Sequence, residues 1–473
     1  MTDHTVSVDL ATVQRFDRPG PRYTSYPTAV EFTEEVGEAE YRQKLAASNA
    51  EGDEPLSLYV HLPFCEHRCL FCGCHVVITP HMPVAEKYME YLHREIDLLA
   101  AELPDRRTLV QMHWGGGTPT YFSPDQLRGL FGKIGEHFTF ADGAEIALEV
   151  DPRVTTGDHL ETLSELGFNR LSMGVQDLTP EVQEAITRNQ TYDQTAELIE
   201  LAREQGFTEG INVDLIYGLP KQRPETFATN LDKIIGLRPD RVAAYSFAYV
   251  PWIRGHQKKL DKADLPSPET KLELYLMAME KFLDAGYEPI GMDHFALPED
   301  ELAVAAHENR LYRNFMGYTV MPASDMVAVG ISGIGEVQQA FFQNEKKLSR
   351  YYQALDDDRL PVQRGYLLSE DDVIRQYVIQ EIMCNFRVSK PDVNERFGIR
   401  FDDYFADALA RLDAVRDAGF VEEDDDALRV TPRGRLFVRN VCMEFDRYLT
   451  EKGQARAESE AEEEETPVFS RTV

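Results

Sequence analysis

Short apolar stretches alternate with longer amphipathic stretches from about residue 55 onward. The apolar stretches are rich in Leu, Val and Ile and have the length of buried strands. They are residues 56–62, 109–114, 146–150, 170–175, 211–217 and 241–247. Helical periodicity marks the intervening stretches, including 86–103, 180–188 and 191–205. Six strand–helix units predict an α/β fold in which parallel strands form a partial (β/α)6 barrel rather than a closed eightfold one.

The pattern changes toward the C-terminus. A helix is predicted at 268–285 and a strand at 287–295, and a mostly helical unit begins near residue 361. This unit has predicted helices at 371–384 and 401–418 and ends in an apolar hairpin, which is typical of a winged helix. A DNA-reading wing needs a basic face, but residues 422–426 are wholly acidic, so a covering or docking role is favoured.

The pattern predicts four parts. They are an N-terminal arm or lid at 1–54, a catalytic barrel at 55–360, a helical winged-helix-like domain at 361–455 and an acidic tail at 456–473. The tail contains the acidic run 458–465, which we expect to be solvated and disordered.

Charge and hydropathy limit the kinds of binding partner and the cellular location that we expect. The chain has 82 acidic and 49 basic residues and a formal net charge of -33, which disfavours nucleic-acid binding. No apolar run approaches the roughly 18 residues of a membrane span, and the N-terminus has no signal pattern. We expect a monomeric cytoplasmic protein without a membrane partner.

Four of the six cysteines lie in one short stretch, as Cys65, Cys69, Cys72 and Cys74. The first three have the spacing C-x3-C-x2-C, so their thiolates can converge on one iron–sulfur cube and leave its fourth iron open to a small molecule. A structural zinc site normally pairs two separate clips, and no second clip is present, although His67 and His75 could complete one. Zinc and incidental buried thiols remain the alternatives.

The loop in its setting, Tyr59-Val60-His61-Leu62-Pro63-Phe64-Cys65, resembles the radical S-adenosylmethionine (SAM) superfamily. Further segments resemble the bacterial oxygen-independent coproporphyrinogen III oxidases, also called dehydrogenases. These segments are residues 21–28, 72–74, 216–220, 291–295 and 384–387. The likeness covers nearly the whole chain.

The resemblance implies that Cys65, Cys69 and Cys72 ligate a [4Fe–4S] cluster whose open iron binds SAM. An electron from a reductant such as flavodoxin would cleave SAM to a 5′-deoxyadenosyl radical. This radical would take a hydrogen from a propionate β-carbon of coproporphyrinogen III. Loss of CO2 and one electron would leave a vinyl group, on two rings, giving protoporphyrinogen IX for haem biosynthesis. The family assigns Cys74 no ligand role.

The resemblance also implies two SAM molecules. Residues expected at the first are Tyr59, Gly116, Gly117, Thr118, Glu149 and Ile334, with Glu149 accepting the ribose hydroxyls as a member of the catalytic set. Residues expected at the second are Phe71, Gln176, Arg188, Asp214 and Ala248. Without the resemblance, Tyr59 and Ile334 would be assigned to the core, the glycine run to a turn, and Asp214 to a structural ion pair. Glycines after a strand are expected to leave N–H and C=O groups free for a ligand.

A substrate with four propionates requires local positive charge. Arg15, Arg18 and Arg22 of the N-terminal arm are predicted to supply it, with Phe315 as a further substrate contact; an ordered arm packed on the barrel is the alternative. The chain departs from the family at Met316, where the family has Gln, and at Gly335, where it has Ser. The remaining alternatives are a haem-binding chaperone on the same scaffold and an enzyme that acts on another porphyrin.

Overall fold

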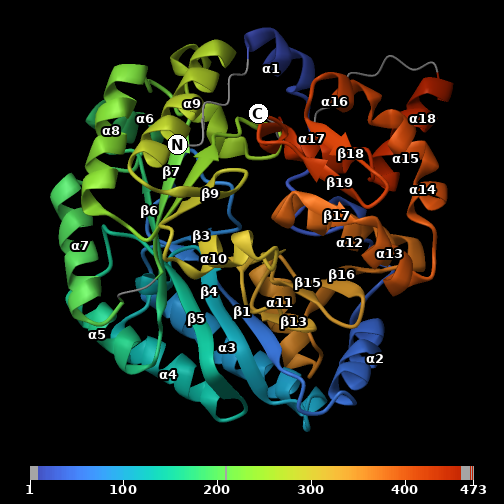
Figure 1. The fold of residues 1–473 in the computed structure, drawn as a ribbon. Helices are drawn as coiled ribbons and strands as arrows, with labels where there is room; N and C mark the ends of the chain where they lie inside the picture. Colours follow the sequence, from blue (N-terminus) through green and yellow to red (C-terminus); the bar gives the residue numbers. More distant parts are fainter. Residues whose placement is uncertain (1–8, 208–209, 460–468, 470, 472–473) are drawn as a thin grey trace.

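Six parallel strands form the centre of a computed structural model that describes residues 9–207, 210–459, 469 and 471. They are adjacent in the order β1 (Leu56–Leu62), β4 (Thr108–Gly116), β5 (Thr139–Val150), β6 (Arg170–Gln176), β7 (Ile211–Tyr217) and β8 (Arg241–Ser246). The partial (β/α)6 barrel predicted from the apolar runs is therefore confirmed (Figure 1).

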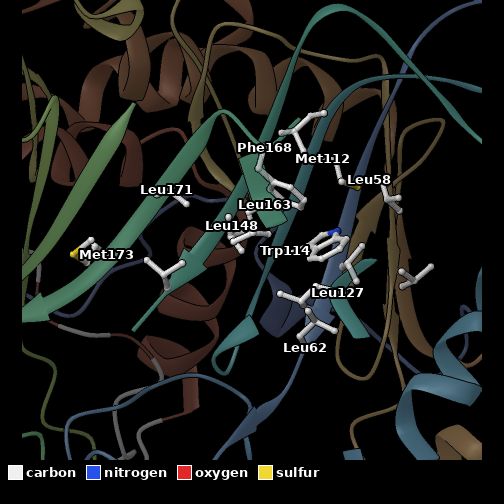
Figure 2. Packing of buried hydrophobic residues seen from close by; sticks show 14 of the residues in the cluster. Leu58, Leu62, Met112, Trp114, Leu127, Leu148, Leu163, Phe168, Leu171 and Met173 are labelled. Carbon is white, nitrogen blue, oxygen red and sulfur yellow. The ribbon is translucent and has the colours of Figure 1, made fainter. Parts of the chain in front are cut away.

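Helices cover the outer face of these strands (Figure 1). They are α3 (Met82–Glu102), α4 (Pro124–Gly135), α5 (Gly157–Glu165), α6 (Pro180–Ile186), α7 (Tyr192–Glu204), α8 (Pro224–Leu237) and α9 (Pro268–Asp284). The core lies between strands and helices, where the ring of Trp114 meets that of Phe168 edge-on at 4.8 Å (Figure 2). Burial of this apolar layer holds the strands in register, so the ends of the strands have fixed positions.

The sheet extends beyond the six predicted strands to twelve. On the β1 side, β13 (Asp325–Val329) pairs in parallel, followed by the antiparallel strands β14 (Ile334–Glu336), β15 (Ala340–Asn344) and β16 (Val362–Leu367). On the β8 side the sheet ends with β10 (His294–Ala296) and β9 (Glu288–Gly291). The single strand predicted at 287–295 is wrong, because the chain reverses at Met292, which has a positive φ of 39°.

The C-terminal region is mostly helical around a small antiparallel sheet. Its helices are α12 (Glu370–Asn385), α13 (Lys390–Phe397), α14 (Phe401–Tyr404), α15 (Ala406–Arg411), α16 (Asp413–Asp417), α17 (Val438–Met443) and α18 (Arg447–Ser459). Its strands are β17 (Arg387–Ser389), β18 (Val421–Glu423) and β19 (Ala427–Val430), in the order β17-β19-β18. The helix predicted at 401–418 is divided into three, with breaks at Phe405 and Leu412.

The N-terminal segment packs on this C-terminal region. Helix α1 (Leu10–Phe16) lies beside the C-terminal helices (Figure 1), and the ring of Phe16 is 4.8 Å from that of Phe420. Arg439 Nε donates to the carbonyl oxygen of Pro21 at 2.8 Å. Helix α2 (Glu38–Asn49) lies farther along, near β16 (Figure 1).

Smaller elements complete the chain. They are β2 (Phe64–Cys65), β3 (Val77–Ile78), α10 (Glu301–His307), β11 (Tyr312–Asn314), β12 (Gly317–Thr319) and α11 (Leu348–Asp356), together with the 3-10 helices η1 (Ala29–Glu31), η2 (Pro119–Tyr121), η3 (Gly255–Lys259), η4 (Lys262–Asp264) and η5 (Gly434–Phe437). Of the predicted acidic tail, residues 456–459 belong to α18 and most of the rest lies outside the described residues. None of the described helices is both long enough and apolar enough to cross a membrane.

Candidate active site

The cysteine loop follows β1 and is held on two sides. Strands β2 and β3 pair in parallel through Cys65 and Ile78 at its base. On one side, Leu70 N donates to the carbonyl oxygen of Ile186 at 2.9 Å, at the end of α6. On the other, His256 Nε2 lies 2.9 Å from the carbonyl oxygen of Cys72. The loop is therefore fixed against the carboxyl end of the barrel, where parallel α/β folds carry their chemistry.

Two arginines approach the sulfur of Cys69. Arg188 Nη1 lies 3.6 Å and Arg153 Nη2 3.7 Å from this Sγ, and both guanidinium groups pair with Asp151. Burial raises the pKa of Cys65 to about 11, although Thr118 Oγ1 lies 3.4 Å from its sulfur. A hydrogen bond from the Cys74 thiol lowers the pKa of Cys72 to about 6. The loop thus favours thiolate at Cys72, and the thiolate is the metal-binding form.

The spacing of the thiols bears on which metal group they fit. A single zinc ion with ligands at 2.3 Å would bring its sulfurs to within about 4 Å of one another. Among the described residues, only one group of three Cys, His or carboxylate side chains has its ligand atoms within 4.8 Å of one another. This group is Asp97, Glu136 and His137, which contains no residue of the cysteine loop. A cavity of about 760 Å³ opens beside Cys65 and extends to Arg68, Asp151 and Lys259. The loop cysteines do not form such a close set, and a roomy cavity lies beside Cys65, so they suit a cluster better than one ion.

The glycine run at the end of β4 is pressed against the cysteine loop. Gly116 has a φ of +116°, and a Cβ on Gly117 would lie 2.6 Å from the carbonyl oxygen of Phe64. The amide of Gly117 donates to Leu62 at 2.8 Å and that of Thr118 to Phe64 at 2.9 Å. The expectation that these N–H groups are free for a ligand is wrong, because they tie the loop to the sheet.

The barrel interior is lined with polar side chains. Tyr59, His113, Glu149, Ser172, Asn212, Asp214 and Tyr245 are each partly accessible although they lie on central strands. Alternation along a strand places every second side chain on this inner face. The interior is therefore a hollow with hydrogen-bonding walls rather than a filled core.

Glu149, the residue before the last of β5, lies in this hollow. Its Oε2 accepts from the amide of Gly116 at 3.1 Å, and its Oε1 lies 3.8 Å from His113 Nε2. Burial opposes ionisation, but His113 and the Gly116 amide outweigh it and lower the pKa of Glu149. The side chain is 43% exposed, and this exposure is toward the hollow interior. An ionised carboxylate in this position can accept hydrogen bonds from hydroxyl groups of a ligand. Tyr59 stacks on His113 beside it at 6.1 Å.

Asp214 and Arg188 do not pair with each other. Asp214 accepts from Asn212 Nδ2 at 2.7 Å and Ser172 Oγ at 3.3 Å, and burial, with the nearby charge of Glu149, raises its pKa to about 7. Arg188 bonds instead to Asp151 and to the carbonyl oxygen of Gly174. The structural ion pair considered for Asp214 is absent from the described residues, which leaves its carboxyl group directed at the interior.

The other residues predicted for SAM lie around the same hollow. Gln257 Nε2 donates to the carbonyl oxygens of Phe71 at 3.3 Å and Ala248 at 3.1 Å, so these two are held together. Gln176 ends β6 with a φ of 69°, and Ile334 begins β14.

The three arginines of the N-terminal arm lie in different places in the structure. Arg22 forms an ion pair with Asp293 and lies over the ring of Tyr245 at 5.5 Å, which places it at the barrel interior. Arg18 pairs with Glu444 at 2.7 Å, and Arg15 is exposed on α1. The structure therefore brings only Arg22 of the three to the barrel, and the ordered-arm alternative describes the other two.

The hairpin of β11 and β12 carries the predicted substrate contact. The ring of Phe315 meets that of Phe341 edge-on at 5.8 Å. Met316, the first departure from the family, donates its amide to Asn314 Oδ1 at 2.8 Å. At the second departure, a Cβ on Gly335 would lie 2.7 Å from the carbonyl oxygen of Met326, so the local backbone of β13 and β14 accommodates only glycine without a shift.

Asp151, Arg153 and His113 were missed by the sequence reading. Asp151 had a signal, since it follows β5 directly and the carboxyl ends of parallel strands meet at one edge. Arg153 and His113 had none, because only the fold reveals that they contact Cys69 and Glu149.

Comparison with known proteins agrees with this geometry. The Radical SAM superfamily model matches residues 59–234, and the HemN C-terminal domain model matches residues 368–437. Together with the cysteine loop and partial barrel, these matches define a radical SAM oxidoreductase.

Relatives that match nearly the full length of the chain identify the family within this class of enzyme. The oxygen-independent coproporphyrinogen III oxidase of Escherichia coli K12 is 44% identical over 96% of this chain and 98% of its own length. That of Synechocystis is 40% identical over 97% and 98%. The solved structure of coproporphyrinogen III oxidase (HemN) from Escherichia coli, described as a radical SAM enzyme, superimposes with a TM-score of 0.89 at 43% identity, covering 94% of this chain and 99% of that one. The chain belongs to the oxygen-independent coproporphyrinogen III oxidase family.

Proposed function

We propose that this protein converts coproporphyrinogen III to protoporphyrinogen IX without oxygen, by oxidative decarboxylation of two propionates to vinyl groups. The observation that carries the proposal is the cysteine loop fixed directly above a hollow, polar barrel interior into which Glu149 and Asp214 project. The names of the relatives support the choice of substrate.

The chain's own residues hold the reacting groups. Cys65, Cys69 and Cys72 would ligate the [4Fe–4S] cluster, and the cluster with bound SAM supplies hydrogen-atom abstraction. Glu149, kept ionised by His113 and Gly116, would accept hydrogen bonds from the ribose hydroxyls of the first SAM.

Residues on the β6–β8 side of the hollow would hold a second SAM. Asp214 would accept from its ammonium group, and Phe71 and Ala248, linked through Gln257, would frame its position. Charge-assisted hydrogen bonds of this kind hold a zwitterion more tightly than neutral ones.

Arg22 provides positive charge for a substrate propionate. Its guanidinium group already lies over Tyr245 at the interior. We propose that residues 1–54 cover the barrel 55–360 as a lid and that 361–455 forms the domain on which the lid rests. The protein would act as a cytoplasmic monomer, reduced by a carrier such as flavodoxin.

Anaerobic turnover tests the proposal. The reconstituted protein is incubated with SAM, dithionite and coproporphyrinogen III, and the porphyrin products and released CO2 are measured. Two CO2 and two vinyl groups per substrate are expected, and none from Cys69→Ala. Tight haem binding with no vinyl product would overturn the proposal in favour of the haem-binding chaperone.

A further inference from the structure

One exposed segment of this acidic protein is basic. Residues 252–262 read Trp-Ile-Arg-Gly-His-Gln-Lys-Lys-Leu-Asp-Lys, with four Lys or Arg and one Asp, in a chain where acidic residues outnumber basic ones by 82 to 49. Lys258, Lys259 and Lys262 are exposed. Arg68 of the cysteine loop adds a further cation, since it lines the same cavity as Lys259, although Glu66 and Glu184 line that cavity as well.

This segment is bonded to the cysteine loop. His256 Nε2 lies 2.9 Å from the carbonyl oxygen of Cys72, and Gln257 Nε2 donates to that of Phe71 at 3.3 Å. Cys72 is one of the proposed cluster ligands. The basic segment therefore borders the place where an electron must enter.

Two large apolar side chains stand among these cations. Trp252 is 46% exposed and Ile253 50% exposed, whereas the chain's other tryptophan, Trp114, is fully buried. Tryptophan and arginine are enriched at the centres of protein interfaces, and charged residues usually form the rim. Exposed Trp252 and Ile253, followed by the half-buried Arg254 and then by three exposed lysines, have this composition.

We infer that Arg68, Trp252, Ile253, Arg254, Lys258, Lys259 and Lys262 form a basic docking surface for a small acidic protein that carries one electron. The inference rests on the proposed function, which requires reduction of the cluster from outside. One electron leaves the reduced carrier and enters the cluster, and no atom is transferred. A net charge of -33 repels an acidic protein elsewhere on the surface, so a local basic area selects where it binds.

Binding is measured first, by calorimetric titration of the anaerobic holoenzyme with an oxidised acidic flavodoxin. Lys258→Glu with Lys262→Glu is expected to raise the Kd about tenfold, and Trp252→Ser to raise it at least as much. The matched control reverses two exposed cations elsewhere, Lys233→Glu on α8 with Arg400→Glu before α14, and changes the net charge equally. A Kd that changes equally in the control, or in no variant, overturns the inference.

Turnover with two reductants separates docking from catalysis. The Lys258→Glu, Lys262→Glu variant is expected to lose about tenfold in product formation driven by reduced flavodoxin and to keep wild-type product formation driven by dithionite. Equal losses with both reductants would assign the surface to substrate entry and overturn the inference. If the wild type forms no vinyl product with either reductant, the proposed function fails, while the titration still decides whether the carrier binds here.

Discussion

Replacing Gly117 with alanine is expected to disturb the cysteine loop without changing a cysteine. The added Cβ would lie 2.6 Å from the carbonyl oxygen of Phe64 and from the carbonyl carbon of Pro63. These are backbone atoms at the base of the loop, so they cannot rotate away as a side chain would. Overpacking of this kind costs about 1–3 kcal/mol. Displacement also weakens the 2.8 Å bond from Gly117 N to Leu62, worth about 1 kcal/mol.

The expected total is about 2–4 kcal/mol. For a domain the size of the barrel, each kcal/mol lowers the Tm by about 2–4 °C. The assay compares the Tm of the cluster-free protein and the iron and sulfide bound after reconstitution. Gly129→Ala is the control, since Gly129 is exposed on α4 with no atom within 4 Å of an added Cβ, and alanine there stabilises a helix by about 0.5–1 kcal/mol. A Gly117→Ala protein with wild-type Tm and full cluster content would refute the reasoning.

Three further outcomes are expected. Cys69→Ala should abolish cluster absorbance and SAM cleavage while Cys442→Ala, far from the loop, retains both; retained cleavage in Cys69→Ala would contradict the ligand assignment. Burial raises the pKa of Glu336 to about 7, so the folded state holds a proton that the unfolded state releases near pH 4.5, and stability falls as pH rises between these values. Glu336→Gln should therefore show a smaller fall in Tm between pH 5 and 8, and an equal or steeper fall would be inconsistent with this linkage. Asp325→Ala should lower the free energy of unfolding by about 3–5 kcal/mol, because it removes the buried partner that lies 2.6 Å from Arg106; a loss below about 1 kcal/mol in a urea titration would show that Arg106 is satisfied without it.

The six barrel strands could be predicted because each is a short, mostly apolar stretch rich in Leu, Val, Ile and Ala, even though polar residues interrupt it where side chains face the barrel interior. Strands β14 and β15 could not be predicted in the same way. They are three and five residues long and follow the glycine-containing stretch 330–333, which reads as a loop. Only pairing with β13, itself positioned by β1, makes them strands. Apolar periodicity that passes through Phe405 and Leu412 predicts one continuous helix at 401–418, but the backbone breaks at both residues.

The features of the candidate site also differ in whether the sequence could predict them. The spacing of Cys65, Cys69 and Cys72 is local and could be read directly from the chain. The partner of Arg188 could not, because Asp151 is 37 residues away in sequence and only the fold brings the α6–α7 connection, which holds Arg188, to the end of β5. Likewise, the positions of Arg18 and Arg22 a few residues apart gave no sign that one would pair with Glu444 and the other with Asp293.

The packing of the N-terminal segment on the C-terminal helices sets an order on assembly during synthesis. Tyr23 donates to Asp446 Oδ2 at 2.9 Å, and Asn440 Nδ2 donates to the carbonyl oxygen of Phe16 at 2.8 Å. The ribosome makes Phe16 and Tyr23 at the start of synthesis and their partners Asn440 and Asp446 near its end. Residues 16–23 therefore have no docking site until the chain is almost complete, while the barrel strands emerge much earlier. Through that interval these contacts cannot hold Arg22 at the barrel interior, so the barrel can form, and its cysteine loop can take up a cluster, before the two ends of the chain meet.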